Sequence, residues 1–366
     1  MRLLVATPLY PPDSGGPATY AKALVEGLPG MGIEVVLVSF SDVRHLPKLI
    51  RHLAYFWNVL LASRGTDLIL ALDPVSVGLP TSIAAFFARK TFVVKVVGDY
   101  AWEQGRERFG LWLPLDEFVR TSHIPFPVYL FRVVQTFVAG RAHTIIVPSN
   151  YLKRIVTVWG IQPDHIVVIV NAEPSEAPGV VPVSVASALT PRIVTSGRLV
   201  PWKGMQGVIA AMITVRESIP NAELIIIGDG PDRDTLERYA QVRIGSGYVF
   251  TGSIPHAEAL AVMQTADVFV LNSTYEGLSH ILLEALSLGK AIVATNAGGN
   301  PEVIQHEENG LLISVGDPEQ LSASILSILK NTSLRSRLEI SARESSKCYS
   351  VQNMLTATSE LLASLT

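Results

Sequence analysis

The sequence predicts an α/β protein of two Rossmann-like domains, each a doubly wound parallel sheet, facing each other across a cleft. Short apolar, β-branched runs alternate with longer segments of helical period. Strands buried on both faces read as continuous apolar runs, and alternation with helices favours parallel crossovers. The predicted strands are residues 3–6, 35–38, 68–71, 92–97, 144–147 and 166–170 in the first half, and 192–195, 224–227, 248–251, 268–271, 291–294 and 311–313 in the second.

The length of 366 residues suits two domains of ordinary size. We assign residues 1–171 to an N-terminal domain and residues 192–350 to a C-terminal domain. Residues 172–191 between them are rich in Ala, Pro, Val and Ser and lack helical period, so they read as a linker.

Composition excludes several classes of protein. With 48% apolar and 17% charged residues, the chain is not intrinsically disordered, and its one cysteine excludes a disulfide framework or thiolate cluster. The net charge of −3 argues against a nucleic-acid binder, although residues 1–170 carry +4 and residues 171–366 carry −7. The start lacks leader-like features and no uncharged apolar run reaches about 18 residues, so we expect a cytoplasmic protein.

The strongest motif is residues 268–286, which read as a strand, a short loop and the start of a helix. Glu276 and Glu284 lie eight positions apart there, and Gly277 permits close backbone approach to a helix N-terminus that can accept an anion. Because like charges repel, glutamates at this place suit sugar or ribose hydroxyls better than phosphate. On spacing alone, a helix-capping Glu276 and a solvated Glu284 stay open as the simpler interpretation.

This Glu-x7-Glu block, with residues 289–303 after it, resembles the retaining family 4 glycosyltransferases of the GT-B fold. Three further landmarks agree in order: residues 11–16 (PPDSGG), 196–204 (SGRLVPWKG) and 227–231 (IGDGP). The resemblance spans almost the whole chain and is densest from 192 to 316. It also implies that residues 351–366 form a C-terminal helix packing back on the N-terminal domain.

The resemblance implies transfer of a hexosyl group from a nucleoside-diphosphate sugar, with retention and without metal or other cofactor. UDP-sugar is the favoured donor and GDP-sugar the rival. The acceptor would be a hydroxyl of a saccharide or a polyprenyl-linked saccharide, in cell-surface polysaccharide or glycolipid assembly. No Asp-x-Asp metal motif flanked by apolar strand residues is present, and residues 232–234 read more simply as a capping pair that opens a helix.

By motif position, Arg198 and Lys203 would hold the donor diphosphate, whose leaving-group charge fixed cations stabilise. Glu276 would contact donor-sugar hydroxyls and Glu284 the ribose hydroxyls. Two surface cations are the alternative for Arg198 and Lys203. The predicted donor-binding set is Gly15, Gly16, Gly197, Arg198, Lys203, Gly228, Gly230, Ile254, Glu276, Gly277, Leu278, Ser279, His280 and Glu284. A simple turn before a helix is the alternative for Gly15 and Gly16.

One departure from the family concerns the acceptor side. Many relatives carry a His-Asp pair after the fourth strand, whereas this chain has Gly98 followed by Asp99. We predict Asp99 as a catalytic residue together with Glu276, Arg198 and Lys203, and the alternative is a turn or N-cap aspartate. The further acceptor-side candidates are Tyr100, Trp102 and Glu103.

The missing histidine leaves one serious alternative function, a catalytically weakened nucleotide-sugar-binding scaffold. We favour a live enzyme because the departing phosphate oxygen can itself take the acceptor proton. A nucleotide-sugar epimerase is disfavoured by the Glu-x7-Glu block. A nicotinamide oxidoreductase is disfavoured because the first turn lacks Gly-x-Gly-x-x-Gly.

Two stretches raise the question of peripheral contact with the inner face of the cell membrane. Residues 44–64 place apolar side chains at helical spacing, with cations mostly off that stripe. Such a helix either lies on an anionic bilayer or packs its apolar face on the sheet in the ordinary way. Residues 109–114 and 124–131 are aromatic and punctuated by proline, which suits an acceptor loop or a lipid-facing patch.

Overall fold

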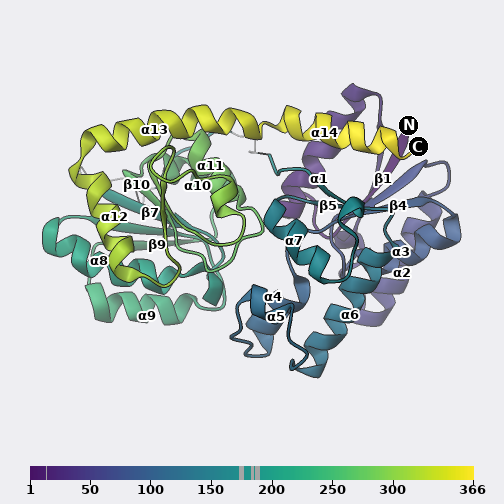
Figure 1. The fold of residues 1–366 in the computed structure, drawn as a ribbon, viewed down its shortest axis with the longest axis horizontal. Coiled ribbons are helices and arrows are strands. Elements are labelled where there is room, and N and C mark those ends of the chain that lie inside the picture. Colours follow the sequence, from purple (N-terminus) through teal and green to yellow (C-terminus); the bar gives the residue numbers. More distant parts are fainter. Residues whose placement is uncertain (14, 173–176, 183–184, 186–189) are drawn as a thin grey trace. The chain divides into compact units, whose positions relative to one another are not determined.

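The computed structural model describes residues 1–13, 15–172, 177–182, 185 and 190–366, and the chain divides into two compact units (Figure 1). The first unit is Met1–Ala172 with Ser350–Thr366, and the second is Glu173–Tyr349. Ten residues of the predicted linker (173–176, 183–184 and 186–189) lie outside the described residues. Ser14 in the predicted Gly-Gly loop lies outside them as well.

The first unit is built on a six-stranded parallel sheet in the order β2-β1-β3-β4-β5-β6. All six predicted strands of this half are confirmed, with ends that differ by at most two residues. Strand order reverses between β1 and β3, so the loops that follow these two strands diverge there. The strands are β1 Arg2–Thr7, β2 Glu34–Ser39, β3 Leu68–Ala71, β4 Thr91–Lys95, β5 Thr144–Val147 and β6 Ile166–Val168.

Helices cover both faces of this sheet. The right-handed crossover rule places α1 on one face and α2, α3 and α6 on the other. The C-terminal helix α14 packs on α1, where a side chain in place of Gly27 would overlap Leu355. The helices are α1 Gly16–Gly27, α2 Lys48–Ala62, α3 Gly78–Ala88, α4 Tyr100–Arg108, α5 Leu115–Phe118, α6 Phe126–Arg141, α7 Asn150–Val158 and α14 Val351–Ser364, with short 3-10 turns η1 Leu28–Met31, η2 Phe40–Val43 and η3 Pro163–His165.

Helix α2 does not bury the apolar stripe that the sequence shows. Tyr55 and Val59 face the sheet and are fully buried, whereas Leu53, Trp57 and Leu61 are more than half exposed. The interpretation of an ordinary helix with its predicted stripe on the sheet is therefore wrong. The helix is apolar on most of its circumference, and the aromatic Tyr55 side packs inward, where its hydroxyl donates to the Val38 carbonyl at 3.0 Å.

The second unit repeats the design with strand order β12-β11-β10-β7-β8-β9, again wholly parallel. Its six predicted strands are confirmed, and order reverses between β7 and β10. The elements are β7 Arg192–Ser196, η5 Pro201–Lys203, α8 Met205–Ser218, β8 Glu223–Ile227, α9 Arg233–Ile244, β9 Tyr248–Gly252, α10 His256–Gln264, β10 Val268–Leu271, α11 His280–Ser287, β11 Ile292–Thr295, η6 Asn300–Glu302, β12 Leu311–Ile313, α12 Pro318–Lys330, α13 Thr332–Ser346 and η7 Lys347–Tyr349.

The residues of the inner strands are almost all buried, because helices pack on both sides of each sheet, whereas the outer strands β2, β6 and β9 are mostly half-buried. This explains why the strands read as continuous apolar runs rather than as alternating ones. None of the helices in the described ranges is long and apolar enough to cross a membrane.

Candidate functional site

The centre of the candidate site is an ion pair between two residues that the sequence singles out. Lys203 ends η5 after β7, and Glu276 lies in the loop after β10, so the pair sits where strand order reverses. Lys203 Nζ lies 2.6 Å from Glu276 Oε1, and Ser273 Oγ donates to the same oxygen at 2.6 Å. The Lys203 and Glu276 side chains are only 16% and 10% exposed, so solvent screens this contact weakly.

Backbone contacts between three loops hold Glu276 in place. Gly298, in the loop after β11, has a φ of +57°, and a side chain there would overlap the Glu276 carbonyl. The Gly299 amide donates to that carbonyl oxygen at 2.9 Å. The Thr274 amide donates to the Trp202 carbonyl at 2.8 Å, which joins the loops after β10 and β7. Only glycine fits position 298, because the conformation and the close approach both exclude a Cβ.

The N-terminus of α11 follows Glu276 closely in the chain. Gly277, Leu278 and Ser279 are buried and lead directly into His280, the first residue of the helix. Ser279 occupies the N-cap position without a side-chain cap hydrogen bond, and the first turn contains no acidic residue. The positive end of the helix dipole is thus directed at this loop.

Glu284 lies one turn along α11 and is buried. Its Oε1 is 3.1 Å from Nε2 of His256, the first residue of α10. The simpler interpretation of a capping Glu276 and a solvated Glu284 is therefore wrong, because Ser279 holds the N-cap position and both carboxylates are buried and paired. Sequence reasoning missed His256, although it lies only two residues after Ile254, which the sequence predicts to bind the donor.

The loops after β7 and β8 are bound to each other along their length. The Gly197 amide donates to the Ile227 carbonyl at 3.0 Å, and the Leu199 amide donates to the Asp229 carbonyl at 2.9 Å. A side chain at Gly228 would overlap the backbone of Gly197, and one at Gly230 would overlap that of Leu199. Gly228 and Gly230 therefore have a packing function, and their contact with the donor stays a prediction.

The other predicted donor contacts in this unit have these places. Arg198 is exposed between Gly197 and the buried Leu199, and Ile254 is half-buried between β9 and α10. Asp232 occupies the N-cap position of α9, so the prediction that residues 232–234 open a helix is confirmed, but its side chain makes no cap hydrogen bond. Among the described residues no three His, Cys, Asp or Glu side chains gather as metal ligands.

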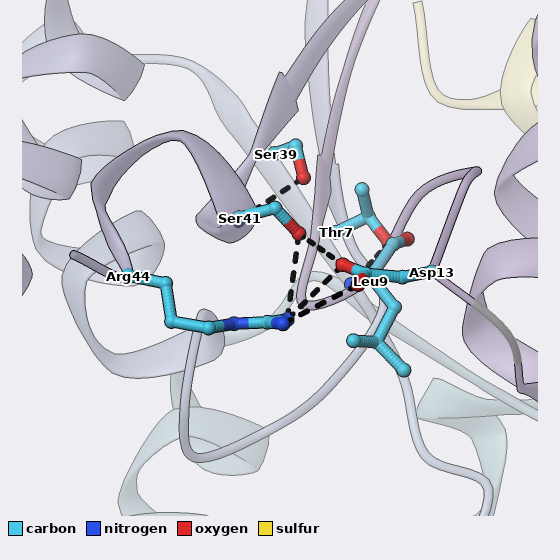
Figure 2. A network of polar contacts seen from close by, with 6 residues as sticks. All are labelled: Thr7, Leu9, Asp13, Ser39, Ser41 and Arg44. Carbon is cyan, nitrogen blue, oxygen red and sulfur yellow. Dashed lines mark hydrogen bonds and ion pairs between the residues drawn. The ribbon is translucent and has the colours of Figure 1, made fainter.

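In the first unit, the loop between β1 and α1 is fixed by a polar network (Figure 2). The Ser41 hydroxyl donates to Asp13 Oδ2 at 2.5 Å, and Arg44 Nη2 lies 3.2 Å from the same oxygen. The hydrogen bond from Ser41, and then the charge of Arg44, hold the pKa of Asp13 below its ordinary value. The network ties this loop to η2, just before Gly15, which is the N-cap of α1, and Gly16, its first residue.

Asp99 is the N-cap of α4 and is fully buried. Its Oδ1 accepts from the Trp102 amide at 2.9 Å, and its Oδ2 accepts from Trp159 Nε1 at 3.1 Å. Burial raises the pKa of this carboxyl. The N-cap interpretation is therefore confirmed, and this engagement weighs against the predicted role of Asp99 with the acceptor.

The remaining acceptor-side candidates lie in the first two turns of α4. Trp102 is fully buried and its Nε1 donates to the Leu113 carbonyl at 2.8 Å, which is a structural contact. Tyr100 and Glu103 are half-buried, and the Tyr100 ring packs edge-on to Phe131. Contact of these residues with an acceptor stays a prediction.

Comparison with known families decides the classification. The family described as Glycosyltransferase Family 4 matches residues 14–172, and the one described as Glycosyl transferases group 1 matches residues 186–345. The chain belongs to the family 4 glycosyltransferases. The two matches fall on the two sheets in turn.

Curated relatives of this glycosyltransferase match it over less than half of their length. An uncharacterized glycosyltransferase of Methanocaldococcus jannaschii is 34% identical over 142 residues, which is 38% of this chain and 36% of the relative. The GDP-mannose-dependent phosphatidylinositol monomannoside mannosyltransferase of Mycobacterium tuberculosis is 31% identical over 38% of each chain. A lipopolysaccharide core glycosyltransferase of Rhizobium meliloti is 32% identical over 44% of this chain and 47% of the relative.

Solved structures confirm the GT-B fold of the glycosyltransferase. The Anabaena protein HepE, in complex with UDP and glucose, superimposes with a TM-score of 0.78 at 20% identity over all of both chains. Sucrose-phosphate synthase of Thermosynechococcus elongatus superimposes with a TM-score of 0.79 at 19% identity over 100% of this chain and 98% of the other. At this identity the likeness establishes the fold alone.

Proposed function

We propose that the protein is a retaining, metal-independent hexosyltransferase that uses a nucleoside-diphosphate sugar, with UDP-sugar favoured and GDP-sugar the rival. The observation that carries the proposal is the buried Lys203–Glu276 pair beside the uncapped N-terminus of α11. A cation and a helix N-terminus suit a diphosphate, and a carboxylate between them suits sugar hydroxyls. Binding of UDP and glucose by HepE supports the choice of donor.

Each residue has a distinct proposed role. Lys203, Arg198 and the first amides of α11 hold the diphosphate and stabilise its charge as the bond from the anomeric carbon to the phosphate oxygen breaks. Lys203 and Ser273 both contact Oε1 of Glu276, and its Oε2 accepts from donor-sugar hydroxyls. Glu284, oriented by His256, accepts from the ribose hydroxyls.

The acceptor is a hydroxyl of a saccharide or lipid-linked saccharide in cell-surface polysaccharide or glycolipid assembly. Its oxygen forms the new bond to the anomeric carbon on the face that the phosphate leaves, and its proton passes to the departing phosphate oxygen. The phosphatidylinositol mannoside and lipopolysaccharide core activities named for two relatives support this acceptor class. This route suits a site in which Gly98 stands in place of histidine and Asp99 is buried.

Gly98 and the buried Asp99 also favour a second candidate, a nucleotide-sugar-binding scaffold with weakened catalysis. The two candidates differ in turnover and share donor binding. Sugar transfer to an added acceptor, or slow hydrolysis of the bound donor, would be seen with the enzyme and not with the scaffold.

The test is the change in Tm with UDP, GDP and their sugars, in magnesium and in EDTA, because ligand that binds the native state raises Tm. We expect a selective rise that EDTA does not reduce. Glu284→Ala should lose donor affinity by about tenfold or more, equivalent to about 1.4 kcal/mol. Glu276→Ala should lose mainly turnover, and Glu217→Ala, an exposed glutamate on α8, serves as control.

No rise in Tm with any nucleotide would overturn both candidates. A rise that disappears in EDTA would contradict the metal-independent role of Lys203 and Arg198. Unchanged donor affinity in Glu284→Ala would remove the ribose assignment alone.

A further inference from the structure

The outer sides of α2, α3 and α6 form one apolar face of the first unit. These three helices cover the same face of the sheet and lie side by side (Figure 1). Their exposed side chains include Trp57, Phe86, Phe87 and Phe126, which are 56% to 70% exposed. Such a group of exposed aromatic side chains is unusual on the surface of a soluble monomer and indicates an interaction site. We call it the outer face.

Ring contacts make the outer face continuous across the three helices. Phe56 of α2 lies 6.2 Å from Phe87 of α3, measured between ring centroids. The Arg141 guanidinium, at the end of α6, lies 4.9 Å from the Phe86 ring and 5.6 Å from the Phe137 ring. The face thus combines aromatic rings with cations stacked on them.

The charge of the outer face has one sign. Residues 48–64, 78–91 and 126–143 contain seven Lys or Arg and no Asp or Glu, whereas the whole chain has 29 basic and 32 acidic residues. Cations beside exposed aromatic and aliphatic side chains, without carboxylates, are complementary to an anionic lipid surface. An ordinary solvated helix face mixes both signs.

Two pockets hollow the rim of the outer face. The Arg64 pocket, of about 780 Å³, lies between α2 and α3 and is lined by Trp57, Arg64, Phe87 and Lys90 among others. The Arg141 pocket, of about 410 Å³, is lined by Phe86, Arg89, Lys90 and Arg141 among others. Lys90 lines both, so the two pockets adjoin.

The position of the pockets separates them from the donor site. Arg64 precedes β3, and Lys90 immediately precedes β4, so both pockets lie at the amino ends of the strands. The residues expected to handle substrate follow the carboxyl ends. Arg89 also holds a left-handed φ of +52° at the end of α3, a position that favours glycine.

We propose that the outer face docks on an anionic lipid bilayer, with the aromatic side chains entering the acyl boundary and the two pockets taking anionic headgroups. The docking itself is independent of sugar transfer. Its use, to hold the enzyme at a lipid-linked acceptor, rests on the proposed function.

The experiment is flotation of the full chain with vesicles of phosphatidylcholine alone or phosphatidylcholine mixed with phosphatidylglycerol. We expect binding to the mixed vesicles that weakens with added salt, and little binding to phosphatidylcholine. Trp57→Ser with Phe87→Ser, and separately Arg64→Gln with Lys90→Gln, should each weaken binding by at least about tenfold. The nucleotide-induced rise in Tm should stay unchanged, which separates this test from that of donor binding.

Matched controls come from exposed residues of the second unit. Val242→Ser with Ile340→Ser removes exposed apolar side chains there, and Lys330→Gln with Arg337→Gln removes exposed charges. Both pairs should leave vesicle binding unchanged. Arg89→Gly should weaken binding while leaving Tm equal or higher, because glycine suits that backbone conformation.

Three results would overturn the proposal. The first is absence of binding to mixed vesicles. The second is a loss of vesicle binding in the control pairs as large as that in the outer-face pairs. The third is a dimer in sedimentation velocity that Trp57→Ser with Phe87→Ser converts to monomer, without vesicle binding, which would make the outer face a contact between two copies of the chain.

Discussion

The two units share a six-stranded parallel sheet, yet they differ sharply in what their surfaces expose. Among the described residues, 17 large apolar side chains are exposed in the first unit and four in the second. The four are Val180, Val242, Val315 and Ile340, none of them aromatic, whereas the first unit exposes eight aromatic rings. The same sheet design therefore carries two different surfaces, and most of the difference lies on α2, α3 and α6, which bear 12 of the 17 exposed side chains.

The two units also differ in how the loops that follow their strands are held in place. In the second unit, backbone hydrogen bonds join the loop after β7 to the loops after β8 and β10, and the loop after β11 to that after β10. These backbone hydrogen bonds fix the loops that carry Lys203 and Glu276, whose side chains are in contact. Such pre-organisation reduces the ordering cost of binding. In the first unit the described network around Asp13 rests mainly on side chains, which bring η2 to the β1–α1 loop.

The largest effect is expected from Gly298→Ala, which tests the rigidity of the second unit. The new Cβ would overlap the Glu276 carbonyl and hold an unfavourable φ, so we expect a loss of about 2–4 kcal/mol in unfolding free energy. Donor binding should fall with it, because Glu276 must move. Calorimetry and nucleotide titration measure the two effects.

Gly316→Ala is the matched control for this substitution. Gly316 has a φ of +77°, but nothing lies within 4 Å of the position that a Cβ would take. It should cost about 1 kcal/mol, the conformational cost alone, and leave donor binding unchanged. Equal losses in the two variants would show that overlap with Glu276 does not matter.

The fold could be predicted from the sequence because a buried parallel strand appears in it as a short continuous run of apolar residues. Val268–Leu271, for example, is a four-residue apolar run ending in a polar loop, and it forms the strand that precedes Glu276. The Lys203–Glu276 contact could not be derived from spacing, since its partners are 73 positions apart and meet only through sheet order. His256 carried no motif, so its contact with Glu284 emerged only in three dimensions.

The sequence could not decide between two roles for Asp99 or between two orientations of α2. Asp99 fits both a catalytic carboxylate and an N-cap, and only its burial and the bond from Trp159 favour the cap. On α2, Leu53 and Trp57 form one apolar stripe and Tyr55 and Val59 another. Periodicity finds amphipathic helices, and it cannot orient a helix that is apolar on two sides.

The next prediction concerns buried cations, because one in the second unit is paired with a carboxylate and one in the first unit is not, within the part of the chain that the structure describes. In the second unit, Arg192 on β7 is paired with Glu223 at 3.0 Å. In the first, Lys95 on β4 is buried with its Nζ 3.8 Å from the centre of the Tyr20 ring, and no hydrogen-bond partner for Nζ is found among the described residues. Burial lowers the pKa of Lys95 to about 7.

The pH dependence follows from this pKa. Between about pH 7 and 10.5 the unfolded chain holds the Lys95 proton that the folded chain has lost, so the free energy of unfolding should rise with pH across this range. Lys95→Met should abolish that rise and stabilise the first unit at pH 7 and below by on the order of 2–4 kcal/mol. Lys48→Met, at an exposed lysine of α2, should change neither the pH dependence nor the free energy of unfolding at pH 7. Unfolding at several pH values measures both. A destabilised Lys95→Met with an unaltered pH profile would contradict the assignment.

The smallest effect, and the direct test of the difference between the surfaces, is Leu53→Ala on α2. Leu53 is 64% exposed, so its truncation should change the free energy of unfolding by no more than about 0.5 kcal/mol. Val59→Ala, on the opposite side of the same helix, removes fully buried methyl groups and should cost about 1–3 kcal/mol although less carbon is lost. Denaturant unfolding measures both. If Leu53→Ala cost as much as Val59→Ala, Leu53 would be covered in solution, and the excess of exposed apolar surface on the first unit would be smaller than the structure gives.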